Sequence, residues 1–63
     1  MKEMYVYAVQ EMTPEANEFV TFAILSSIVR AEKVKAEYER EYPQNEYKIE
    51  CFPVDDKFFT KED

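Results

Sequence analysis

The spacing of hydrophobic residues changes along the chain, and this change predicts the secondary structure. Residues 4–10 and 19–25 are two nearly continuous apolar and aromatic runs. Short apolar runs rich in aromatic and β-branched residues predict strands. Pro14 and Asn17 lie in the polar segment between the runs, and both residue types favour turns. We therefore expect a hairpin with an irregular loop.

From residue 28 onward, apolar residues recur at spacings of three and four, which indicates one face of a helix. They are Ile28, Ala31, Val34, Tyr38 and Tyr42. Ser26 or Ser27 can cap this helix, because a serine hydroxyl accepts a hydrogen bond from an early backbone N–H. Pro43 disfavours the helical conformation of the residue before it, so we expect a helix over residues 28–42.

Apolar and polar residues alternate over residues 46–54, which is typical of a half-buried strand. Tyr47, Ile49 and Cys51 share one face of this strand, and charged residues lie between them. We expect the shared face to point into the core, so that the Cys51 thiol is buried and unreactive.

The order strand, strand, helix, strand predicts an α+β fold. A right-handed crossover through the helix makes the second and third strands parallel, and the first strand fits between them. We therefore expect one ββαβ domain over residues 1–56, with a three-stranded antiparallel sheet in the order 2-1-3 and the helix packed on one face. Residues 57–63 are expected to form a charged C-terminal tail.

The first two predicted strands are apolar on both faces, whereas a sheet with one wet face should alternate apolar with polar residues. Because one helix covers only one face, we expect an exposed apolar surface, which usually marks an interaction site. The residues assigned to this surface are Tyr5, Tyr7, Val9, Val20, Phe22, Ile24, Phe58 and Phe59. Two alternatives stay open: Phe58 and Phe59 fold back over the sheet, or the tyrosines are half-exposed. We expect self-association through this uncovered face.

The composition excludes several kinds of catalytic and binding site. The chain has no glycine, no histidine and one cysteine. The absence of glycine excludes Gly-rich phosphate-binding loops. The absence of histidine excludes Ser-His-Asp and Cys-His machinery, and it removes the usual nitrogen ligand of zinc. We therefore expect a protein that is not an enzyme, with no metal site and no cofactor.

The charge balance is acidic, with 14 acidic and 8 basic residues and a net charge of −6. This excess disfavours direct binding to nucleic acid and to anionic membranes. An acidic surface is expected at Glu46, Glu50, Asp55 and Asp56, and mimicry of a nucleic-acid backbone by these carboxylates is one alternative function.

The sequence also predicts a cellular location and offers a second alternative function. The N-terminus lacks the layout of a signal peptide, and a single cysteine suits a reducing compartment, so we expect a cytoplasmic protein. The other alternative is a ligand-binding module, such as a nucleotide sponge, whose pocket is lined by Tyr5, Tyr7, Phe22 and Arg30.

A set of motifs surrounds the predicted helix. The motif residues are Leu25, Ser26, Ser27, Ala31, Glu32, Tyr42 and Pro43, followed by the alternating acidic segment 47–50. This arrangement resembles small ββαβ proteins of unknown function in bacteria and their phages. The chain departs from this pattern by lacking glycine around the hairpin. The resemblance spans residues 4–56 and implies a ββαβ fold in a bacterial or phage setting, without a catalytic residue.

Compact acidic phage proteins of this kind look like inhibitors of host machinery or of host defence. Together with the apolar strands, the resemblance favours a non-catalytic homo-oligomer that inhibits a host protein. An anti-defence or host-takeover role is the expected setting of that inhibition.

Overall fold

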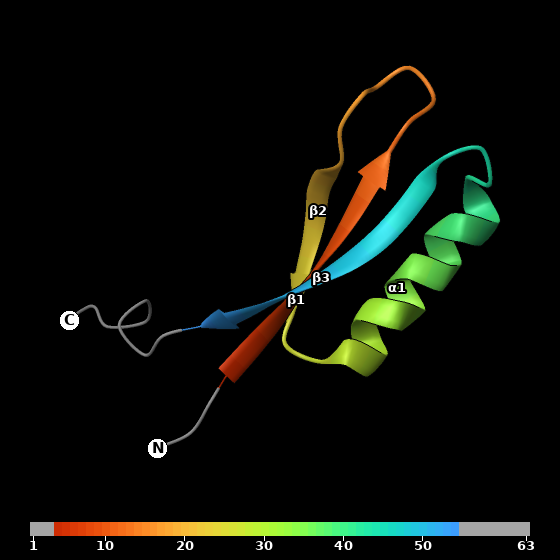
Figure 1. Ribbon diagram of the computed structural model, residues 1–63. Helices are drawn as coiled ribbons and strands as arrows, with labels where there is room; N and C mark the ends of the chain where they lie inside the picture. The colour runs from red at the N-terminus through yellow and green to blue at the C-terminus, as the bar shows by residue number, and fades with distance from the viewer. Residues whose placement is uncertain (1–3, 55–63) are drawn as a thin grey trace.

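The computed structural model describes residues 4–54, which contain three strands and one helix (Figure 1). In chain order they are β1 (Met4–Met12), β2 (Val20–Leu25), α1 (Ile28–Glu41) and β3 (Glu46–Val54). The sheet has the order β2-β1-β3, and β1 is antiparallel to both neighbours. The predicted α+β fold and strand order are confirmed. The predicted tail, residues 57–63, lies outside the described residues.

An irregularity in the pairing of β1 with β2 changes the faces that the β2 side chains occupy. Val9 lies opposite Ala23, whereas the next residue, Gln10, lies opposite Thr21. Phe22 is therefore an additional residue on β2, as in a β-bulge. Because side chains alternate between the faces of a sheet, one additional residue reverses the alternation beyond it.

Serine capping starts the helix as the sequence predicts. The Oγ atom of Ser27 accepts a hydrogen bond from the backbone N–H of Arg30 at 3.3 Å. At the other end, the backbone N–H of Tyr42 donates to the Tyr38 carbonyl at 2.8 Å, and Pro43 follows. The cap and the proline thus define the two ends of α1.

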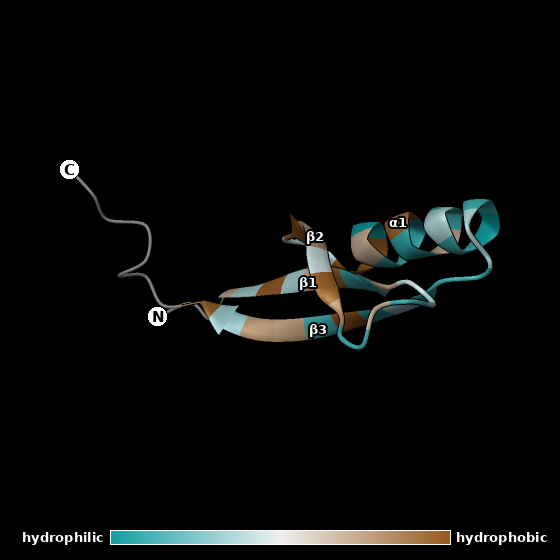
Figure 2. Cartoon of the chain, turned by 90° about the horizontal axis from the view of Figure 1, so that it is seen from above, coloured by the Kyte–Doolittle hydropathy of each residue, from teal (hydrophilic) through white to brown (hydrophobic). Residues whose placement is uncertain are grey.

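The core is small because the helix packs on one face of the sheet only. Figure 2 shows α1 on one side of the three strands, and α1 packs across β1 and β3 with a smaller contact to β2. The fully buried hydrophobic residues among those described are Ala8, Val9 and Ala31. Two of the three are alanines, so large buried side chains contribute little to this core.

Cys51 is exposed, so the predicted burial of its thiol is wrong. Cys51 lies opposite Tyr7 near the end of β3. The sheet twists, as sheets do, and the C-terminal part of β3 runs away from α1 (Figure 1). Alternation places Cys51 on the helix-facing side, but the helix does not cover this part of the strand.

Candidate functional site

Aromatic contacts identify the face of the sheet that the helix covers. The ring centroids of Phe22 and Tyr38 are 4.6 Å apart, and those of Tyr38 and Tyr47 are 6.1 Å apart. Phe22 on β2 and Tyr47 on β3 therefore lie under α1. Tyr47 is opposite Glu11, and Val9 follows on the same side of β1, so these residues also belong to the covered face.

The opposite side of the sheet, which we call the open face, carries the alternate residues of each strand. Among residues 4–54, no helix or strand packs over it (Figure 2). Its residues are Met4, Val6, Ala8, Gln10 and Met12 of β1, Thr21 and Ile24 of β2, and Glu46, Lys48, Glu50, Phe52 and Val54 of β3.

One half of the open face is polar, and its polar groups interact with one another. Gln10 Nε2 donates a hydrogen bond to Thr21 Oγ1 at 3.0 Å. Lys48 Nζ forms an ion pair with Glu50 at 3.2 Å and lies 4.6 Å from the centroid of the Phe19 ring. The charges of Lys48 and Glu50 therefore offset each other, whereas Glu46 adds a negative charge at the end of the polar half.

The other half of the open face is an apolar patch, made of Met4, Val6, Ile24, Phe52 and Val54 around the small residue Ala8. Ile24 is 64% exposed, Phe52 44% and Met4 40%. Val6 lies opposite Phe52, and Ala8 lies opposite Ile24, so Phe52 and Ile24 flank the central strand β1 on its two sides. Clustered apolar side chains of this size are typical of a contact surface.

The structure separates the residues that the sequence assigned to one uncovered surface. Ile24 lies on the open face, but Val9 is fully buried and Phe22 packs against Tyr38. Tyr5 and Tyr7 are on the helix-facing side, and Tyr5 is exposed there. Val20 is exposed at the start of β2. The assignment of Val9 and Phe22 to an uncovered face is therefore wrong, whereas Tyr7 is half-buried opposite the exposed Cys51. Phe58 and Phe59 lie outside the described residues.

Two properties of the strands explain this difference. The bulge at Phe22 breaks the alternation that groups Phe22 with Ile24. In addition, β1 is apolar on both faces, so hydrophobicity alone does not identify the face under the helix. The sequence reasoning therefore missed Met4, Val6, Phe52 and Val54. The only indication of these residues is that side-chain alternation and strand pairing place them on the same face of the sheet as Ala8.

The predicted acidic surface is only partly described. Glu46 and Glu50 lie on the polar half of the open face, where Glu50 pairs with Lys48. Asp55 and Asp56 lie outside the described residues. Within the described part of this surface, the negative charge of Glu50 is therefore offset by the neighbouring Lys48.

A hydrogen-bonded cluster joins β1 to the turn before β3. The Glu11 carboxylate accepts hydrogen bonds from Tyr47 Oη at 3.0 Å and from Asn45 Nδ2 at 2.9 Å. Desolvation raises the pKa of the Tyr47 hydroxyl above its ordinary value; the carboxylate of Glu11 raises it further, and the hydrogen bond from Asn45 opposes the shift. Each group has a partner, so the cluster stabilises the turn and offers no free catalytic group. In residues 4–54, no three His, Cys, Asp or Glu side chains gather as a metal site.

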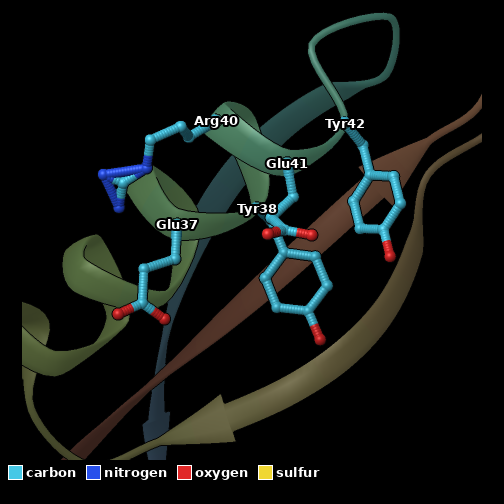
Figure 3. Close-up of a pocket in the computed structure, with 5 residues that line it drawn as sticks. All are labelled: Glu37, Tyr38, Arg40, Glu41 and Tyr42. Carbon is cyan, nitrogen blue, oxygen red and sulfur yellow. The ribbon is translucent and has the colours of Figure 1, made fainter.

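A hollow of about 400 Å³ lies at the C-terminal end of α1. It is lined by Glu37, Tyr38, Arg40, Glu41 and Tyr42 (Figure 3). The rings of Tyr38 and Tyr42 have centroids 6.1 Å apart and are inclined by 36°. The sequence reasoning assigned both tyrosines to the packing stripe of the helix, and their exposure at the helix end was not anticipated.

Two of the residues suggested for a nucleotide pocket, Arg30 and Phe22, lie apart in this fold. Arg30 lies in the first turn of α1, beside Leu25 and Val34. Phe22 packs near the last turns of the helix, against Tyr38. The cation for a phosphate and this stacking ring therefore lie toward opposite ends of α1.

Comparisons with protein-family models, with curated proteins and with solved structures found no match to this chain. Within residues 4–54, none of the helical structure is long and apolar enough to cross a membrane. The resemblance to small bacterial and phage ββαβ proteins therefore stays a prediction from the sequence motifs. The apolar patch of the open face and the hollow at the end of α1 are the two surfaces on which a functional proposal can rest.

Proposed function

We propose that this chain is a small non-catalytic interaction protein that acts as a homo-oligomer, with the apolar patch as its self-association surface. The observation that carries the proposal is the exposure of three apolar side chains, Met4, Ile24 and Phe52, on the same uncovered sheet face. Large apolar side chains are favoured at the centre of interfaces, because removing them from water contributes about 25 cal/mol per Å².

The small core supports a second copy as the occupant of this face. Chains of this length bury a limited fraction of their surface on folding, and oligomerisation often supplies the missing stability. Here the fully buried hydrophobic residues among those described are Ala8, Val9 and Ala31. Pairing two apolar patches would place a second apolar layer on the side of Ala8 opposite the helix.

The charges on the open face are also compatible with self-pairing. The chain has a net charge of −6, so two copies repel each other at most surfaces. The apolar patch has no charged member, and Lys48 and Glu50 at its border form an ion pair. A two-fold arrangement brings the same patch of each copy together, and here it can do so without facing unpaired charges of one sign.

Inhibition of a host protein is the functional setting that we propose for this oligomer. It rests on the resemblance to small acidic phage proteins and on the acidic charge of the chain. An acidic oligomer concentrates negative charge, which favours association with a basic surface on a protein target.

The oligomer is tested by measuring molar mass against concentration for the wild type and for Ile24→Lys. Val29→Lys is the matched control, since Val29 is 71% exposed on the helix and lies outside the open face. We expect an oligomer for the wild type and for Val29→Lys. Ile24→Lys should raise the dissociation constant by at least about a hundredfold, because two like charges are brought together in an apolar contact. A folded wild-type monomer at tens of micromolar would refute the proposal.

A further inference from the structure

We infer that the hollow at the C-terminal end of α1 binds an organic cation, namely a guanidinium or alkylammonium group. This site goes beyond the proposed self-association, because its lining residues all come from the end of the helix, on the side of the sheet opposite the open face. Such a cation is the head group of an arginine or lysine side chain, or a free small molecule of the same chemistry.

Two aromatic rings supply the first element of the site. The Tyr38 and Tyr42 side chains are 37% and 44% exposed, and their ring centroids are 6.1 Å apart. A cation is attracted to the face of a tyrosine ring within about 6 Å of its centroid. At this separation, one cation placed at the mouth of the hollow can contact both rings.

Carboxylates supply the second element. Glu37 and Glu41 line the hollow together with the two tyrosines (Figure 3). Arg40 also lines the hollow, but its side chain extends away from the two rings in the same view. The lining of the hollow therefore carries two carboxylates and one guanidinium, which leaves a net negative charge. The C-terminal end of a helix adds partial negative charge from its last carbonyl groups.

The two rings are held in place before any ligand binds. One side of Tyr38 packs against Phe22, with centroids 4.6 Å apart, and its ring also lies 6.1 Å from that of Tyr47. Tyr42 is the C-cap residue, and its backbone is restricted both by its hydrogen bond to the Tyr38 carbonyl and by Pro43. Preorganisation reduces the ordering cost of binding, so a shallow site can still select its ligand.

Titrations monitored by NMR test this inference, with acetyl-arginine-amide and tetramethylammonium chloride as probes. Sodium chloride at matched concentration controls for ionic strength, and tert-butanol serves as a neutral probe of similar shape. We expect saturable shifts at Tyr38 and Tyr42 with both cations but not with sodium chloride or tert-butanol. Tighter binding of the arginine probe would indicate a protein side chain as the natural ligand, and tighter binding of tetramethylammonium would indicate a small quaternary ammonium compound.

Variants assign the binding to the hollow. Tyr42→Leu should raise the dissociation constant about two- to fivefold, the equivalent of one exposed cation–π contact, whereas Tyr42→Phe should retain binding. Glu41→Gln should also weaken binding, whereas Glu32→Gln removes the same charge nearer the start of the helix and should have little effect. Equal effects of Glu41→Gln and Glu32→Gln, or the absence of saturable shifts, would overturn the inference. Repeating the titration with Ile24→Lys separates this result from the oligomer, because the hollow is unchanged in that variant.

Discussion

The Phe22 ring packs against the Tyr38 ring with a centroid distance of 4.6 Å, and this contact fixes the face of the sheet that lies under the helix. Ile24, two residues further along β2, is on the opposite face because Phe22 is the additional residue of the bulge. The bulge thus places one large side chain in the aromatic cluster and leaves Ile24 exposed. The proposed interaction surface follows from this local irregularity.

The small core predicts a steep cost for truncating Val9, which is fully buried in the central strand. Val9→Ala removes two methyl groups and leaves a cavity, so the free energy of unfolding should fall by about 2 kcal/mol. Chemical denaturation measures the change. Val20→Ala is the control, because Val20 is 59% exposed at the start of β2, and it should change the free energy by less than about 0.5 kcal/mol. Equal losses for the two variants would contradict the described core.

The helix cap predicts different effects for two adjacent serines. Ser27 Oγ accepts the hydrogen bond from Arg30 N–H, so Ser27→Ala should lower the free energy of unfolding by about 1 kcal/mol. Ser26 precedes the cap and is exposed, so Ser26→Ala should have little effect. Thermal unfolding of both variants under identical conditions is the test, and a larger loss for Ser26→Ala would refute the assigned cap.

Tyr47 predicts a loss of stability at high pH. Desolvation and Glu11 raise the pKa of its hydroxyl in the folded state, so the folded protein keeps this proton at pH values where the unfolded chain loses it. The stabilisation is complete below the ordinary tyrosine pKa of about 10 and decreases as the pH rises through the folded pKa. Tyr47→Phe should make the free energy of unfolding less dependent on pH in this range.

The ultraviolet absorbance of tyrosinate provides the measurement for Tyr47. The Tyr47 hydroxyl should titrate above the ordinary tyrosine range in the wild type, and this step should be lost in Tyr47→Phe. Tyr7→Phe is the control and should retain it. If the late step is also present in Tyr47→Phe, the hydrogen bond to Glu11 does not have the proposed effect.

The exposure of Cys51 predicts rapid alkylation of its thiol in the folded protein. Its thiol is exposed and is on the helix-facing side of β3, away from the apolar patch. A maleimide reagent should therefore label the native protein at a rate within about tenfold of that of the denatured chain, since access to the thiol controls labelling. Mass spectrometry measures the rate. Strong protection in the native protein would place Cys51, and not the open face, in the proposed subunit contact.

The sequence predicted the elements and their order because each has a local signal. Ser27 and Pro43 bound the helix, and alternation defines β3, which the structure confirms as Glu46–Val54. Which face the helix covers has no such signal, since β1 is apolar on both sides. The bulge at Phe22 depends on the pairing of two strands, and the exposure of Cys51 depends on the twist of the sheet. These features arise from tertiary structure and were not predictable from local pattern.

The candidate sites were less predictable than the fold for the same reason. Tyr38 and Tyr42 have the spacing of packing residues, and their exposure becomes visible only when the end of α1 is placed against the sheet. The contacts of Glu11 with Asn45 and Tyr47 likewise join residues that are distant in sequence. The composition favours an interaction surface over a catalytic site, but it does not identify the residues that form such a surface.

The most direct test of self-association through the open face is an isotope-filtered NMR experiment on a mixture of labelled and unlabelled chains. Only contacts between different copies give signals in this experiment. The proposed interface predicts intermolecular contacts from the Ile24 methyl groups and the Phe52 ring, and none from Val29 on the helix. Intermolecular contacts from Val29 with none from Ile24 or Phe52, or no intermolecular contact at all, would contradict the proposed interface.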